Sequence, residues 1–133
     1  MERHWEPYLR KEKGRRAPRF YVTINRFGDI TLNRHTFEEI GSPAAVVLLL
    51  DRIEGTIGLK QARPQEPNAF RVRPAGKCGN QRIRAARFCS DLRINADPTI
   101  RFVEPTIEGG VLVLDLAATV TVKRNKMQAD PAG

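Results

Sequence analysis

The stretch "FYVTINRFGDITLNRHTFEEIG", residues 20–41, decides the fold that the sequence predicts. Apolar and polar residues alternate over its first six positions, a pattern typical of a half-buried strand. A turn at Gly28 leads into a second short strand, where Ile30 and Leu32 continue the alternation. The remaining residues carry the start and stop signals of a short helix. The stretch therefore predicts a compact unit of strand, turn, strand and helix.

Two arrangements can cap the start of this helix. Asn33 can act as the N-cap, or Thr36 and Glu39 can form a capping box. Gly41 ends the helix, and Pro43 prevents it from resuming. The sequence does not decide between these two caps, but it does predict that the helix ends at Gly41.

The same order of elements recurs further along the chain. Apolar strands follow the helix at 44–51 and 56–60, and a proline-containing linker occupies 61–69. Residues 20–60 and 70–116 then each read strand, turn, strand, helix, strand, turn, strand. An internal duplication explains this order, and a β-rich domain with recurring strand spacing is the alternative. The matched positions, 50 or 51 residues apart, are Phe20 and Phe70, Gly28 and Gly79, and Phe37 and Phe88.

A ββαββ half exposes sheet edges and an apolar face, and two halves that interleave their strands cover both. The sequence thus predicts a mostly β fold, a small pseudo-two-fold β-barrel built from two ββαββ halves with two short helices. The apolar strands over 46–50 and 111–114 are expected to cover the inward helix faces. The helix residues expected to be buried there are Phe37, Ile40, Phe88 and Leu92.

A chain of 133 residues is long enough for one domain with a packed core. We expect a flexible basic arm over 1–18, one barrel domain over 19–122 and a polar tail over 123–133. No apolar run approaches the roughly 20 residues that span a bilayer. The first residues also lack the apolar centre of a secretory signal, so the expected location is the cytoplasm, without a membrane partner.

Cysteines and histidines are too few to suggest a disulfide framework or a metal site. Cys78 and Cys89 are expected to be reduced thiols, since two cysteines build no framework. His4 and His35 lie at no finger-like spacing from a cysteine pair. We therefore expect neither a metal nor any other cofactor.

Positive charge is concentrated in two parts of the chain. The formal net charge is +8, and residues 71–93 hold seven basic residues against Asp91 alone. Residues 1–19 hold seven basic and three acidic residues, whereas residues 20–70 are close to neutral. A field of this kind attracts polyanions, which makes nucleic acid the leading class of partner.

The unit at 20–41, followed by "AAVVLLLD" and "TIGLK", resembles the AbrB and SpoVT swapped-hairpin domain, which also occurs in MraZ-type regulators and MazE-type antitoxins. The first half covers the family pattern from Phe20 to Lys60, and the second half follows it in outline. In most members two chains interleave to form one barrel. The resemblance implies that a single chain carries both halves here, and that it binds DNA as a transcriptional regulator.

Alternation along the strands predicts a DNA-binding face on the second half. Outward arginines on two neighbouring strands, a lysine in their turn and an arginine in the following helix can converge there, and two arm arginines can add backbone contacts. The first half lacks such outward cations. We therefore expect the two halves to differ in function, with the second half and the N-terminal arm in contact with the polyanion. The predicted nucleic-acid-binding residues are Arg71, Arg73, Lys77, Arg82, Arg84, Arg87, Arg15 and Arg16.

Other readings stay open from the sequence. The arginines can be a solvated face that keeps a basic protein in solution. A protein-interaction or antitoxin-type module without sequence-specific DNA binding is a second class. The chain can also form a homodimer, and the sequence identifies no protein partner. A small enzyme is a third, with Asp29 near His35 or Cys78 beside Lys77 as candidate groups, although neither pair has a complete catalytic set. Duplex DNA, RNA and the target sequence are not distinguished by composition.

Overall fold

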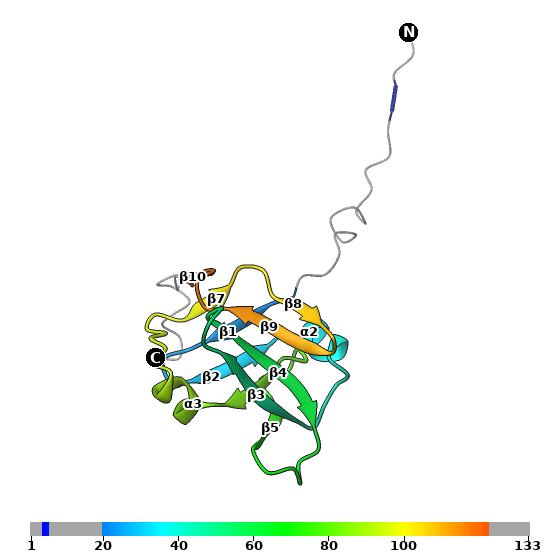
Figure 1. The fold of residues 1–133 in the computed structure, drawn as a ribbon. Helices are drawn as coiled ribbons and strands as arrows, with labels where there is room; N and C mark the ends of the chain where they lie inside the picture. Colours follow the sequence, from blue (N-terminus) through cyan, green and yellow to red (C-terminus); the bar gives the residue numbers. More distant parts are fainter. Residues whose placement is uncertain (1–3, 6–19, 123–133) are drawn as a thin grey trace.

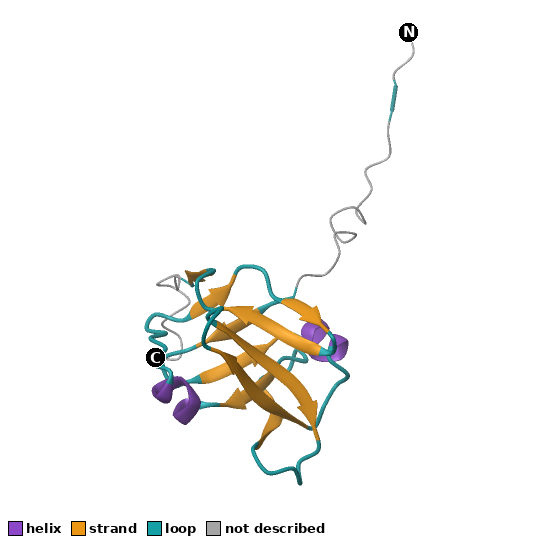
Figure 2. Ribbon diagram, viewed as in Figure 1, coloured by secondary structure: helices purple, strands orange, loops and turns teal. Residues whose placement is uncertain are grey.

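The computed structural model describes residues 4–5 and 20–122. Most of the predicted arm and the whole predicted tail lie outside these residues. The described part is mostly β, as the alternation predicted, with two short helices (Figures 1 and 2). The strands are β1 Val22–Ile24, β2 Asp29–Leu32, β3 Ala45–Asp51, β4 Thr56–Ala62, β5 Ala69–Pro74, β6 Gln81–Arg84, β7 Ile100–Phe102, β8 Thr106–Glu108, β9 Val111–Asp115 and β10 Thr119–Thr121, and the helices are α2 Arg34–Glu39 and α3 Ala86–Asp91.

All ten strands of the described chain belong to one antiparallel sheet. Their order is β10-β7-β1-β2-β6-β5-β3-β4-β9-β8, so neighbours in space are often distant in sequence. No ladder joins β10 to β8 within this part of the chain, and the sheet curls into a half-barrel instead of closing completely. The two helices lie at opposite sides of the strands in Figure 2.

The last part of the sheet differs from the prediction in two places. The predicted order has only a turn between the last two strands of the second half, but the structure has a further strand there, β8, which pairs with β9 around a turn formed by Gly109 and Gly110 at positive φ. The predicted order of elements ends at residue 116, whereas Thr119–Thr121 beyond it form β10 and pair with β7. A turn at Asp115 causes the change, since its carboxylate accepts from the backbone N–H of Ala117 at 2.9 Å.

Buried and partly exposed residues alternate along β1, β2 and β9, and the inward residues of these strands form much of the core. Val22 and Ile24 of β1 face Leu32 and Ile30 of β2 across the ladder, and all four are fully buried. The opposite wall contributes inward residues of the strands β4 and β9. The largest side chain that is fully buried is Phe102 of β7. Other members of this core include Val46, Ile57, Leu59, Ile83, Leu112 and Leu114.

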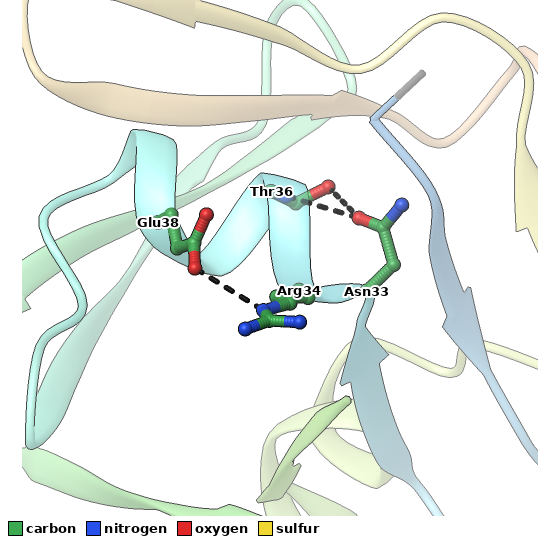
Figure 3. A network of polar contacts seen from close by, with 4 residues as sticks. All are labelled: Asn33, Arg34, Thr36 and Glu38. Atoms are coloured by element: carbon green, nitrogen blue, oxygen red, sulfur yellow. Dashed lines mark hydrogen bonds and ion pairs between the residues drawn. The ribbon is translucent and has the colours of Figure 1, made fainter. Parts of the chain in front are cut away.

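Asn33 caps helix α2, which resolves the two arrangements that the sequence left open (Figure 3). Its side-chain oxygen accepts from the backbone N–H of Thr36 at 3.0 Å, and the Thr36 hydroxyl also donates to it. Thr36 is completely buried, and its Oγ1 accepts from the backbone N–H of Tyr21 at 3.0 Å. The cap therefore ties the start of the helix to the strand β1 as well as closing the helix itself.

The predicted helix faces are only partly right. Ile40 is buried, but Phe37, Phe88 and Leu92 are half-buried. Each helix has six residues, and its most buried position is a small side chain, Thr36 in α2 and Cys89 in α3. Because a small side chain points most directly inward in each helix, the aromatic residue lies at the edge of the core. The sequence pattern had predicted that it would lie inside.

The first residue of each helix packs closely against a glycine in a hairpin turn that is distant in sequence. Gly28, in the turn between β1 and β2, has φ +81°, and a Cβ there would lie 2.5 Å from the Cα of Ala86 in α3. Gly79, in the turn between β5 and β6, has φ +89°, and a Cβ there would lie 3.0 Å from Cδ of Arg34 in α2. The positive φ favours glycine at both positions, and at Gly28 the close approach to the backbone of Ala86 requires it as well.

Truncation of Phe102 is expected to destabilise the protein far more than truncation of Phe37. Phe102→Ala removes a fully buried ring and should lower the free energy of unfolding by about 3–5 kcal/mol. Phe37→Ala removes a half-buried ring and should cost about 1 kcal/mol. Urea unfolding of the two variants measures both values, and equal losses would contradict the burial described above.

Gly28→Ala and Gly76→Ala separate backbone strain from the close approach. The two glycines have nearly equal φ, +81° and +83°, but a Cβ at Gly76 meets nothing within 4 Å. Gly76→Ala should therefore cost only the left-handed strain, about 1–2 kcal/mol. Gly28→Ala should cost about 1–3 kcal/mol more, because Ala86 backbone must move. Thermal unfolding compares them, and equal shifts of the midpoint would show that the contact with α3 is easily relaxed.

Candidate nucleic-acid interface

Four of the predicted arginines line one groove of about 200 Å³ together with Pro74. They come from neighbouring strands, Arg71 and Arg73 from β5 and Arg82 and Arg84 from β6. Their side chains lie on the outer face of the sheet, because Val72 and Ile83 between them are opposite each other and point to the core. We call these four residues and their cavity the basic groove.

The ladder continues this outer face across three further strands. Arg73 lies opposite Arg82, Arg82 opposite Thr31 of β2, and Thr31 opposite Thr23 of β1. Thr23 in turn lies opposite Arg101 of β7. Directly paired residues share one face of a sheet, so these five side chains form one row.

The arginines of this row lack acidic partners among the described residues. The two ion pairs found there are Arg34 with Glu38 at 3.3 Å and Arg87 with Asp91 at 3.6 Å, both at the surface. Arg73 and Arg82 face each other with like charge, which destabilises a strand pair. Asp29, opposite Arg84, is the one acidic residue placed on this part of the face by the register. An anion in the basic groove would relieve this repulsion.

Two of the predicted cations lie elsewhere. Lys77, in the turn between β5 and β6, lines a separate hollow of about 340 Å³ against α2, next to Arg34 and Cys78. Arg87 lies on α3, exposed and paired with Asp91. The two arm arginines of the prediction, Arg15 and Arg16, fall outside the described residues.

Arg101 is a residue of the outer face that the sequence reasoning missed. Its guanidinium lies 5.8 Å from the ring centre of Tyr21, a cation–π contact, and Tyr21 is 42% exposed. Alternation in the strand did place Arg101 outward, between Ile100 and Phe102. The pairing of β7 with β1, which brings it into the arginine row, has no local sequence signal.

The residues considered for an enzyme are held in other contacts. The ring of His35 stacks on Phe20 with centroids 5.2 Å apart. Asn25 donates to the carboxylate of Asp29 at 3.5 Å, and Asn25 in turn accepts from the backbone of the same turn. These contacts organise the hairpin and the start of α2, which is a structural use of both side chains.

The two thiols differ sharply in their surroundings. Cys78 is exposed, whereas Cys89 is 5% exposed and its Sγ lies 4.0 Å from the carbonyl oxygen of Gly28. Burial, with a smaller contribution from the negative charge of Asp29, raises the pKa of Cys89 to about 11. A buried thiol with this pKa is protonated at neutral pH and acts as a small apolar core residue.

Comparison with protein-family models, curated proteins and solved structures finds no match to this chain. Within residues 4–5 and 20–122, no three His, Cys, Asp or Glu side chains gather as they would around a metal ion. In the same part of the chain, neither helix has the length and apolar character needed to cross a membrane. The case for a function therefore rests on the outer face itself.

Alkylation should distinguish the two thiols. At pH 8 a thiol with a pKa of about 11 is roughly 0.1% ionised, so folded Cys89 should react at least about 100-fold more slowly than exposed Cys78. Mass spectrometry after timed treatment with iodoacetamide measures both rates. Denaturation in urea should remove the difference. Rapid labelling of Cys89 in the folded protein would contradict its burial.

Because the folded thiol holds its proton more tightly than the unfolded one, the contribution of Cys89 to the stability of the protein should fall as the pH rises from 9.0 toward 11.

Proposed function

We propose that this protein binds double-stranded DNA through the basic groove and acts as a transcriptional regulator of the AbrB-like kind. The observation that supports this most is the convergence of four arginines, from two strands, on one cavity where none of them forms an ion pair with another described residue. A face that only kept the protein in solution would not need like charges directly opposite each other.

The chemistry of the groove suits phosphate. Arginine presents a planar fork of donors that matches two phosphate oxygens, and it keeps its charge at any physiological pH. Arg71, Arg73 and Arg84 are exposed and Arg82 is half-buried, so all four can reach a ligand from solution. Each phosphate that they neutralise releases counterions, which makes the affinity fall steeply with salt. Guanine edges offer arginine a second kind of contact.

We also propose that the chain is an internal duplication with pseudo-two-fold symmetry, the arrangement expected of two interleaved swapped-hairpin halves. The strand order supports this proposal. When β1, β2, β3 and β4 are matched with β5, β6, β7 and β10, the order β10-β7-β1-β2 mirrors β4-β3-β5-β6 about the ladder between β2 and β6. The second half then ends with β10, past the boundary at residue 116 that the sequence pattern predicted, and the hairpin of β8 and β9 is an insertion that extends the sheet beside β4.

The registers support the same proposal. In the first hairpin Val22, Thr23 and Ile24 pair with Leu32, Thr31 and Ile30, and in the second Val72, Arg73 and Pro74 pair with Ile83, Arg82 and Gln81. Offsets of 50 residues on one strand and 51 on the other convert the first set into the second. Thr31 pairs with Arg82, its own counterpart, which is what a two-fold axis between β2 and β6 requires.

The helix starts add a third support. Gly28 approaches Ala86, the first residue of α3, and Gly79 approaches Arg34, the first residue of α2. Each hairpin turn thus contacts the helix of the other half. The hydrogen bonds at the two helix ends match at an offset of 52 residues, which pairs Phe37 with Cys89 and Thr36 with Phe88. The earlier match of Phe37 with Phe88 is one residue out of step with this pattern.

Under this proposal the outer face has diverged between the halves. Neutral side chains in the first half are the counterparts of Arg71, Arg73, Arg82 and Arg84. These neutral residues and the four arginines lie next to each other across the ladder between β2 and β6. Only the second half therefore carries the cations of the basic groove. The neutral counterparts are Tyr21, Thr23, Thr31 and Asn33.

Replacement of three groove arginines tests the DNA-binding proposal. The variant Arg73→Ala, Arg82→Ala, Arg84→Ala should bind a mixed-sequence 20-base-pair duplex more weakly, because up to three phosphate contacts are lost. The slope of log affinity against log salt should become shallower by up to about 3, roughly one per contact. Fluorescence anisotropy over a salt series measures the affinity and the slope together.

A matched control removes the same charge from the other wall of the sheet. Arg52 lies in the β3–β4 turn, Lys60 in β4 and Arg63 directly after β4, and all three are exposed and lie outside the basic groove. Their replacement by alanine should change the slope by less than about 1. If both triple variants lose affinity equally, binding depends on net charge and the groove has no special part in it. If the unaltered protein fails to bind duplex DNA at low salt, the proposed function is wrong.

A further inference from the structure

We infer that the nucleic-acid footprint extends beyond the basic groove, across β2 and β1, to a second contact formed by Arg101 and Tyr21. This inference rests on the proposed function and specifies its ligand as a polymer that lies across the strands, in place of a small phosphate compound held by the groove alone. The observation behind it is the continuous row Arg73, Arg82, Thr31, Thr23, Arg101 on the outer face.

The spacing of this row sets the size of the ligand. Neighbouring strands lie about 4.8 Å apart, so the three steps from β6 to β7 cover roughly 14 Å. A DNA duplex presents one phosphate charge per roughly 1.7 Å of its axis, both strands counted, and so offers several phosphates over that length. A short polyphosphate can fill the basic groove but cannot reach Arg101 at the same time.

The residues between the two cationic ends suit a phosphate backbone. Thr23 and Thr31 lie in the row with their side chains outward and half-buried, and both hydroxyls can donate to phosphate oxygens. No acidic residue occupies the row itself. A neutral, donor-bearing stretch between two basic ends lets one polyanion contact both.

Arg101 is held in place for this contact. Tyr21 supports its guanidinium at 5.8 Å, and the backbone of Tyr21 is fixed by Asn33 and Thr36, to whose oxygens its N–H donates at 3.3 Å and 3.0 Å. Arg101 takes part in neither of the ion pairs found in the described chain. A positioned arginine loses less side-chain freedom when it binds phosphate.

The test compares two ligands and two single variants. The ligands are a 12-base-pair duplex and inorganic tripolyphosphate, and the variants are Arg82→Ala in the groove and Arg101→Ala at the far end. Arg82→Ala should weaken binding of both ligands. Arg101→Ala should weaken duplex binding about 3–10-fold and reduce the salt slope by about 1, while tripolyphosphate binding stays unchanged. Anisotropy reports the duplex and calorimetry reports tripolyphosphate.

Two further variants serve as controls for this comparison. Arg101→Gln keeps a long polar side chain without the charge and should reproduce the loss if Arg101→Ala does not fold. Arg52→Ala, an exposed arginine of the β3–β4 turn, should leave duplex binding within about 2-fold of the unaltered protein. If Arg82→Ala weakens duplex binding and neither Arg101 variant does, the footprint ends at the groove and this inference fails while the proposed function stands. If none of these substitutions weakens duplex binding, the proposed function fails and the inference fails with it.

Discussion

The ladder between β2 and β6 is the constraint on which the rest of the structure depends. It joins the hairpin of β1 and β2 to that of β5 and β6 through four residue pairs, from Asp29 with Arg84 to Leu32 with Gln81. The same ladder packs Ile30 against Ile83 in the core and sets Thr31 beside Arg82 outside. A slip of one residue would turn arginines inward and isoleucines outward. The core thus fixes the register, and the register fixes the outer face.

The charge arrangement of this face works against the stability of the sheet. Arg73 and Arg82 repel each other across a strand pair, whereas Arg34 and Arg87, on the helices, each have an acidic residue four positions later. Within the described chain, ion pairs are therefore formed by these two helix arginines and not by the arginines that converge on the basic groove. Proteins commonly accept such local repulsion at sites that are completed by a ligand of opposite charge.

Local pattern was enough to predict most of the elements, and it failed where distant pairing decides. The alternation around Val22, Ile30 and Val72 marked the strands correctly, and the cap at Asn33 was one of two foreseen. β10 was missed because three residues of "TVT" become a strand only through pairing with β7. The burial of Thr36 was missed because its hydroxyl is satisfied by Asn33 and the backbone of Tyr21, contacts that a hydrophobicity pattern does not contain.

The candidate site was predictable to the same extent. Alternation alone put Arg71, Arg73, Arg82 and Arg84 on one face, because hairpin neighbours are adjacent in sequence. Lys77 and Arg87 were grouped with them by proximity along the chain, yet the turn and the helix carry these two away from the groove. Arg101 joins the row through its pairing with Thr23 of β1, 78 residues earlier, which a local sequence pattern cannot predict.

The pairing of β1 with β7 also has a consequence for synthesis of the protein. Ile24 meets its partner Ile100 only after the intervening chain has been made, which at ordinary rates of translation takes on the order of ten seconds. Until then the first hairpin emerges with an open edge and an uncovered apolar side. The nascent chain therefore exposes an unpaired strand edge and apolar surface until almost the whole domain has been translated.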